Sequence, residues 1–247
     1  MRKLVILLVV LLALPVSRGR SSVEYTGGIQ GLAISTSAPD LLTNWTIAAW
    51  IYPTIPPNEA GGGAIYSRWT NSTTERQVHL SFTVAGKISV AVPWIAGDIV
   101  LGGTSFDADT WYHIVWTRSG NDWTIYVNGI SDGTGSSAAV QESGCTFILC
   151  RDAATYDQIF TGRVAEVAGW PAVLSLGEIK ALAHGTPPNR IRVGLLKSGG
   201  YYWPLHTRDT VDRFWPDLGG GGWNAESQGG NDVIANHAPM SPPGGAD

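Results

Sequence analysis

Residues 111–129 read Trp-Tyr-His-Ile-Val-Trp-Thr-Arg-Ser-Gly-Asn-Asp-Trp-Thr-Ile-Tyr-Val-Asn-Gly, and this stretch decides the fold class. Two runs rich in aromatic and β-branched residues flank Ser119-Gly120-Asn121-Asp122, and Asn128-Gly129 closes the unit. Aromatic and β-branched side chains suit a pleated, half-buried surface, whereas Gly, Asn and Asp favour turns. The stretch therefore predicts a β-hairpin followed by a second turn, and with it an antiparallel β protein.

Similar strand patterns recur on both sides of this hairpin. The predicted strands are residues 28–35 (an edge strand), 45–51, 64–69, 77–84, 87–92, 147–150 and 163–170. Residues 94–104 and 131–137 contain glycine and turn residues, and they are predicted to be loops. Short strands separated by turns are typical of a β-sandwich.

One helix is predicted within this β pattern. Ser175 is a favourable N-cap, and Glu178 three residues later completes a capping box. Leu176, Ile179, Leu182 and Ala183 then share one helical face, and Gly185 is a suitable C-terminal stop.

The first 19 residues have the pattern of a secretory signal peptide. Arg2 and Lys3 form a basic start, residues 4–16 are apolar, and small residues surround a cleavage point after Gly19. The apolar run is shorter than the roughly 20 residues that span a bilayer. An uncleaved membrane anchor and a wrongly assigned start are the alternatives.

Charge excludes some partners. Cleavage after Gly19 would lower Lys+Arg from 16 to 13 against 20 Asp+Glu, so the net charge would move from −4 to −7. An acidic chain without a basic run is a poor candidate for binding nucleic acid or, after signal removal, a membrane surface.

Three segments, taken in order, resemble the laminin-G-like branch of the concanavalin A-like lectin/glucanase jelly-roll family. They are residues 45–53, the hairpin at residues 111–129, and residues 160–179. The resemblance implies an all-β fold, an antiparallel β-sandwich of the jelly-roll type with one short helix and a C-terminal extension. The expected boundaries are residues 1–19 for the signal, 20–187 for the sandwich and 188–247 for the extension.

The C-terminal extension contains one further strand pattern. Residues 197–205 are predicted to add a strand to the sandwich, followed by a loose tail rich in glycine and proline. The segment resembles one that precedes the sandwich in many relatives, which suggests a circular permutation. Similar tails occur in phage proteins, so a virion origin is an alternative to simple secretion.

Catalysis is not expected. Glycosidases of this superfamily need two carboxylates that face each other across the scissile bond. The strand at 163–170 offers Glu166 alone, because its same-face neighbours are Val164 and Ala168. Relatives usually carry an aspartate where Ala165 stands, which counts against any function of that aspartate here, including a metal role. Asp107 and Asp109 are two residues apart, but their position favours a role in a turn.

Calcium is the cofactor that the resemblance suggests, held at the sandwich rim. Calcium needs several oxygen ligands that converge on a loop. The candidate ligands are loop acids, namely Asp107, Asp109, Asp152 and Asp157, with Asp98 as a further possibility. The alternative is that these acids are simply solvated, and the histidines show no metal-ligand spacing.

Tryptophan supplies the candidate ligand-binding residues. The chain has 11 tryptophans, and aromatic faces suit both sugar rings and protein partners. Trp45, Trp50, Trp111, Trp116 and Trp170 fall in strand patterns and are predicted to be core residues. Trp69, Trp94, Trp215 and Trp223 lie in or beside predicted loops, and they are the ligand candidates.

The sequence therefore favours a non-catalytic recognition module, secreted or displayed on a cell surface, that binds a glycan or glycoprotein through its rim loops. The first alternative is a self-assembling structural or adhesion subunit of a virion or extracellular assembly. The second is a glycosidase. Fold does not fix function, so these alternatives stay open at this point.

Overall fold

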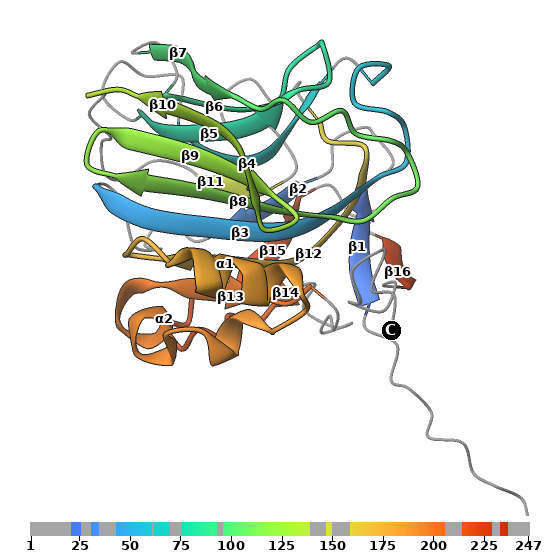
Figure 1. The fold of residues 1–247 in the computed structure, drawn as a ribbon. Coiled ribbons are helices and arrows are strands. Elements are labelled where there is room, and N and C mark those ends of the chain that lie inside the picture. Colours follow the sequence, from blue (N-terminus) through green and yellow to red (C-terminus); the bar gives the residue numbers. More distant parts are fainter. Residues whose placement is uncertain are drawn as a thin grey trace, which may run out of the picture.

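The structure is a computed structural model that describes residues 21–25, 31–34, 43–60, 62–69, 76–92, 96–138, 147–149, 159–205, 214–228 and 233–236. Within these residues, two antiparallel sheets of eight strands each pack face to face (Figure 1). The predicted all-β sandwich is confirmed. Its two sheets are called sheet A and sheet B below.

Sheet A carries the hairpin that decided the fold class. In spatial order it contains β10 (Ile130–Ser136), β9 (Asp122–Val127), β8 (Tyr112–Ser119), β3 (Asn44–Pro53), β12 (Gly162–Trp170), β1 (Ser21–Tyr25) and β16 (Val233–Asn236). An eighth strand, β13 (Tyr201–Trp203), pairs with β12 on the same edge as β1. A bulge at Glu166, whose φ is 54°, separates these two pairings.

Sheet B combines strands from all parts of the chain. In spatial order it contains β14 (Phe214–Trp215), β15 (Ala225–Gln228), β2 (Gly31–Ile34), β11 (Phe147–Leu149), β4 (Gly63–Trp69), β5 (Arg76–Phe82), β6 (Ile88–Val92) and β7 (Ala96–Leu101). The strands predicted at 77–84 and 87–92 are confirmed as β5 and β6, which pair as a hairpin.

The main core lies between the sheets and is rich in aromatic residues. Trp45 and Trp123 meet edge to face with ring centroids 5.5 Å apart, and Trp116 is buried in the same cluster. Such aromatic pairs add to the stabilisation that comes from burying apolar area. Of the five tryptophans predicted to be core residues, four are buried and Trp111 is half-buried.

A second, smaller core lies on the other face of sheet A. There α1 (Leu176–Ala183) and α2 (Val193–Gly199) cover the sheet on the side away from sheet B, as Figure 1 shows. The short 3-10 helix η1 (Pro188–Arg190) connects them. The predicted capping box of Ser175 and Glu178 is confirmed, and Ile179, Leu182 and Ala183 form the buried face of α1.

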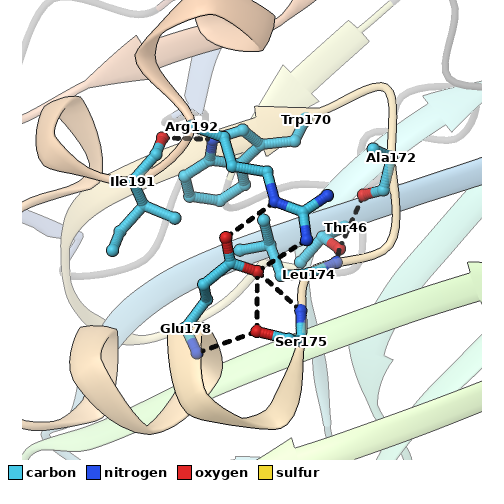
Figure 2. Close-up of polar contacts among 8 residues, drawn as sticks. All are labelled: Thr46, Trp170, Ala172, Leu174, Ser175, Glu178, Ile191 and Arg192. Atoms are coloured by element: carbon cyan, nitrogen blue, oxygen red, sulfur yellow. Dashed lines mark hydrogen bonds and ion pairs between the residues drawn. The ribbon is translucent and has the colours of Figure 1, made fainter.

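Polar contacts tie this helical layer to the sheet (Figure 2). The Thr46 hydroxyl donates to the carbonyl of Ala172 and accepts from the Leu174 amide, both at 2.9 Å. The Trp170 indole donates to the carbonyl of Ile191 at 3.0 Å. The two bonds of Thr46 join β3 to the residues just before α1, so they fix where α1 begins relative to β3.

Several local predictions are wrong. Residues 94–104 and 131–137 contain the strands β7 and β10 rather than only loops, and residues 28–35 contain an interior strand, because β2 lies between β15 and β11. A second helix, α2, occupies the start of the segment predicted as a strand, so the strand there is only Tyr201–Trp203. This strand pairs with β12, so this part of the extension lies in sheet A.

The glycine-rich part of the extension is folded rather than loose. The carboxylate of Asp217 accepts backbone N–H bonds from Tyr202, Gly219, Gly221 and Trp223 at 2.7–3.3 Å. A carboxylate that gathers several amides in this way holds a turn together without regular secondary structure. The strands β14 and β15 flank this turn and complete the edge of sheet B. Residues 237–247 lie outside the described part.

Candidate ligand-binding site

Two adjoining hollows lie beside the first residues of β10. One has a volume of about 240 Å³ and is lined by Thr104, Tyr112, Val127, Asn128, Ile130, Ser131 and Asp132. The other, of about 310 Å³, is lined by Tyr126, Gly129, Ile130, Ser131, Leu176 and Lys180. Because both hollows share Ile130 and Ser131, we treat them as one site and call it the rim groove.

The turn between β9 and β10 forms the centre of the rim groove. Asn128 and Gly129 have φ values of 51° and 79°, the left-handed pair that a tight hairpin turn requires. Asn128 is also tied to β8, because its side-chain oxygen accepts from the His113 amide and its own amide donates to the His113 carbonyl, both at 2.8 Å. The turn is therefore held on both sides.

Helix α1 forms the second wall. A Cβ atom added to Gly129 would lie 3.3 Å from the Cβ of Ala183 and 3.4 Å from the Cα of Lys180, so the helix packs closely against the turn. This contact places Leu176 and Lys180 opposite Ile130. Ile130 is 71% exposed and Leu176 is 50% exposed, so both offer apolar surface to a ligand.

The third wall is the loop at residues 102–104, and Asp132 holds it. One carboxylate oxygen of Asp132 accepts from the Thr104 amide at 2.9 Å and from the Thr104 hydroxyl at 2.6 Å. The Asp132 carbonyl also accepts from the Gly103 amide at 3.1 Å. Thr104 is thereby placed in the lining of the groove.

The rim groove combines the chemistry that suits a sugar. Tyr126, Ile130 and Leu176 supply aromatic and aliphatic surface for the apolar faces of a ring. Ser131 and Lys180, both exposed, supply polar groups for its hydroxyls. The groove lies at the rim, where loops carry binding functions.

The predicted tryptophan ligands do not meet in this groove. Trp215 lies in β14 and is 0% exposed, so the expectation that it faces a ligand is wrong: tertiary packing places it in the main core. Trp223 is partly buried against the same core, and its carbonyl accepts from the Trp203 indole at 2.6 Å. The side chain of Trp69 and all of Trp94 lie outside the described residues.

The groove residues that the sequence analysis missed have a recognisable signal. In Asp122–Val127, Trp123, Ile125 and Val127 are buried, whereas Thr124 and Tyr126 are only half-buried on the opposite face. Alternation along a strand assigns Tyr126 to that outer face. An aromatic residue on the outer face, two residues before a tight turn, could therefore have been recognised as a ligand candidate.

The predicted calcium ligands are only partly described. Asp107 and Asp109 are exposed in the turn before β8, and the Asp109 amide donates to the Pro53 carbonyl at 2.8 Å. Asp152 and Asp157 lie outside the described residues. Across the described part of the chain, no three His, Cys, Asp or Glu side chains gather in a way that would hold a metal ion. Calcium remains a prediction.

The histidine and glutamate of the two central strands have structural surroundings. His113 is buried against Trp50, with ring centroids 5.1 Å apart, and burial lowers its pKa to about 3. The imidazole is therefore neutral at physiological pH. Glu166 is also buried, and its carboxylate accepts a hydrogen bond from the Tyr202 hydroxyl. Neither side chain lines the rim groove. In the described residues, no helix has the length and apolar character needed to cross a membrane.

Comparisons with known proteins assign the fold to a family. The model of the concanavalin A-like lectin/glucanases superfamily matches residues 26–180, so the chain belongs to this superfamily. This confirms the family that the sequence motifs suggested. A search of curated protein sequences finds no match.

Solved structures share the fold at low sequence identity. A Bacteroides ovatus protein to which carbohydrate binding is ascribed is 16% identical with a TM-score of 0.66, over 88% of this chain and 60% of its own. The chain thus spans 60% of that protein's length. A heptameric pentraxin of Limulus polyphemus is 17% identical with a TM-score of 0.54, over 66% and 82% of the two chains. The CBM40 module of the Ruminococcus gnavus IT-sialidase, bound to α2,3-sialyllactose, is 15% identical with a TM-score of 0.53, over 66% and 97%.

Proposed function

We propose that this protein is a non-catalytic recognition module that binds a glycan or glycoprotein in the rim groove. The observation that carries the proposal is the composition of the groove, in which Tyr126 and the exposed Ile130 lie next to Ser131 and Lys180. Family membership is consistent with it. The similar Bacteroides ovatus and Ruminococcus gnavus proteins, which are described as binding carbohydrate, add support by analogy.

The groove favours binding over catalysis. Among the described residues that line the groove, Asp132 is the only carboxylate, and one of its oxygens is engaged by Thr104. Glycoside hydrolysis requires a second carboxyl group on the other side of the scissile bond. Glu166, the acidic residue of β12, is buried, and its carboxylate accepts a hydrogen bond from the Tyr202 hydroxyl. The glycosidase alternative therefore has less support.

The first experiment is a glycan-array screen of residues 20–247, with calcium and with a chelator. The strongest hit is then titrated by calorimetry against wild type and I130D. Ile130 is 71% exposed, so the substitution changes the groove more than the fold. A charge in the centre of the apolar surface should weaken binding by about tenfold or more, a loss of about 1.4 kcal/mol.

The matched control is V84D. Val84 is 77% exposed on the β5–β6 turn and lines neither hollow, so the same change of chemistry should leave the affinity unchanged. Equal affinities for wild type and I130D would refute the groove as the binding site. No binding on the array in either condition would count against glycan recognition itself.

The alternative is a structural or adhesion subunit, as in a virion or an extracellular assembly. The exposed side chains of Ile130 and Leu176 favour it, because apolar surface of this kind also suits a contact between protein chains. Light scattering separates the two proposals. A large, defined particle that I130D breaks into single chains, together with no glycan binding, would favour assembly.

Secretion is part of the proposal, since a glycan-binding module meets its ligands outside the cell. It depends on the leader pattern at residues 1–19, which lie outside the described part. Mass spectrometry of the chain exported from a secreting host gives the test. A mature N-terminus near Arg20 is expected, whereas an intact Met1 would contradict the signal-peptide prediction.

A further inference from the structure

The ammonium group of Lys87 lies among oxygen atoms of the loop that forms one wall of the rim groove. It donates to the carbonyls of Gly103 and Thr104 at 2.7 and 3.2 Å, and to the hydroxyl of Ser105 at 3.1 Å. An ammonium group has three donors, and all three are used here on one short stretch of chain. The loop therefore turns three consecutive oxygen acceptors toward a single positive charge.

Hydrogen bonds fix the backbone of Lys87, and this limits the positions that its ammonium group can take. The Thr83 amide donates to the Lys87 carbonyl at 2.8 Å, and the Lys87 amide donates to the Thr83 hydroxyl at 3.3 Å. These bonds close the turn between β5 and β6. The positive charge of Lys87 thus comes from a hairpin of sheet B whose turn is closed by hydrogen bonds.

The other side of the same loop meets an anion from sheet A. The amides of Gly103 and Thr104 donate to the carbonyl and carboxylate of Asp132, respectively, at 3.1 and 2.9 Å. The Gly102 amide donates to the Ile88 carbonyl at 2.8 Å. Carbonyl oxygens therefore face Lys87 while N–H groups face Asp132, and the loop joins the edges of the two sheets.

We propose that the Lys87 ammonium group is the resident cation of this rim, and that it orders the loop at residues 102–105 in place of a metal ion. Carbonyl and hydroxyl oxygens that converge from one loop are the ligands that a hard cation collects. The compact point charge of a lysine fills the same role without leaving the chain. Lys87 is a positioning residue, because it acts on the groove through Thr104 and is not among the residues that line either hollow.

This proposal predicts that the loop at residues 102–105 is ordered without divalent cations. The calcium site expected from Asp107 and Asp109 is the competing explanation, because a calcium ion there would also order the loop before β8. The effect of Lys87 on glycan affinity rests on the proposed function. The effect of Lys87 on the order of the loop does not, so an experiment can refute the role of Lys87 without refuting glycan binding, and the reverse.

The experiment measures hydrogen exchange of the amides of residues 102–104 in the chain without glycan. The variant is K87M, which keeps the length of the side chain and removes its charge. Exchange should become faster by on the order of tenfold, because three charge-assisted bonds are lost at a partly exposed site. Wild type should exchange at the same rate with calcium and with chelator. Should K87M not fold, K87Q replaces it with the same expectation.

The matched control is K197M on the exposed surface of α2, where exchange at residues 102–104 should stay at the wild-type rate. K87R tests the chemistry, since its planar fork fits three converging oxygens less well than an ammonium group and should restore only part of the protection. Wild-type exchange that accelerates with chelator, or unchanged exchange in K87M, would overturn the proposal.

Discussion

Gly169 leaves room for a side chain that links the two sheets across the core. It pairs with Tyr201 across β12 and β13, and a Cβ atom there would lie 2.3 Å from the Tyr201 ring. The ring instead stacks on Trp203, with centroids 4.4 Å apart, and its hydroxyl meets the hydroxyl of Tyr66 at 2.7 Å. Tyr66 belongs to sheet B, so this bond crosses the core. Burial, followed by the proximity of Tyr66, raises the pKa of Tyr201 well above its usual range and keeps it neutral.

We expect G169A to destabilise the fold by about 1–3 kcal/mol, because the added methyl group would overlap the fully buried ring of Tyr201. Chemical denaturation measures the change. The matched control is G194A in α2, where an added Cβ meets nothing within 4 Å. That variant should be neutral or more stable by up to about 1 kcal/mol, since alanine favours helix. Equal effects of the two substitutions would contradict this account.

The junction of α1 and α2 depends on an ion pair at the helix cap. Arg192 donates from Nε and Nη2 to the two carboxylate oxygens of Glu178 at 2.7 and 2.8 Å (Figure 2). Arg192 has a φ of 41° and precedes the first residue of α2. The hydrogen bond from Arg192 is the main reason why the pKa of Glu178 is lowered to about 2; partial burial opposes it and Ser175 adds to it.

This pair predicts a specific dependence of stability on pH. The pKa of Glu178 falls from 4.5 to about 2 on folding, so the pair stabilises the fold above pH 4.5 and this contribution is lost as the pH falls toward 2. Because the two side chains are 25% and 36% exposed, the contribution is small, about 1 kcal/mol or less. Denaturation of wild type and E178Q should give free energies of unfolding that converge between pH 4.5 and 2.

The R192Q variant is the control for this prediction. It removes the same pair from the other side, so its stability should change with pH as that of E178Q does. If R192Q instead follows the wild-type pH dependence, the low pKa of Glu178 has another cause, with the capping contacts of Ser175 the first alternative.

Strands β7 and β10 show why two elements were predicted as loops. A Cβ atom on Gly133 would lie 2.7 Å from the Leu101 carbonyl oxygen, and one on Gly135 would lie 2.2 Å from that of Ile99. The two glycines therefore let β10 approach β7 closely, where the edges of sheets A and B meet. The segments that contain these strands are rich in glycine and turn residues, so the sequence predicted loops. Only the contact between the sheets explains why glycines stand within a strand.

The entire fold depends on the C-terminal extension. Its strands β13 and β16 belong to sheet A and β14 and β15 to sheet B, so it completes both layers. Trp203 and Trp215 from this part are fully buried in the main core. The sandwich and the extension are consequently one folded unit, although the circular permutation suggested by the sequence remains a prediction.

We expect a chain that ends at residue 205 to lose cooperative unfolding, since it lacks Trp215 and the Asp217 carboxylate that binds the Tyr202 amide. Calorimetry and near-ultraviolet circular dichroism measure this loss. A chain that ends at Met240 is the control and should melt as the full chain does, because it keeps every strand of both sheets. A cooperative transition in the shorter chain would contradict the account.

Much of the fold was predictable because its signals are local. Two runs of aromatic and β-branched residues around the turn at 119–122 define the β8–β9 hairpin, and the capping box at Ser175 defines the start of α1. The candidate site was less predictable, because its residues come from separate places in the chain. Tyr126 and Ile130 flank one turn, but Leu176 and Thr104 reach the groove only through the packing of α1 and the hold of Asp132.

Sequence alone determined the class of the fold and its family, since strand alternation, turn residues and caps act over a few neighbouring residues. The tertiary structure decided which aromatic residues are available to a ligand: Trp215 became part of the core, and Tyr126 came to line the groove. It also decided that Lys87 meets the loop at 103–105. Burial and contact across distant segments depend on how the sheets pack, and no local pattern carries that information.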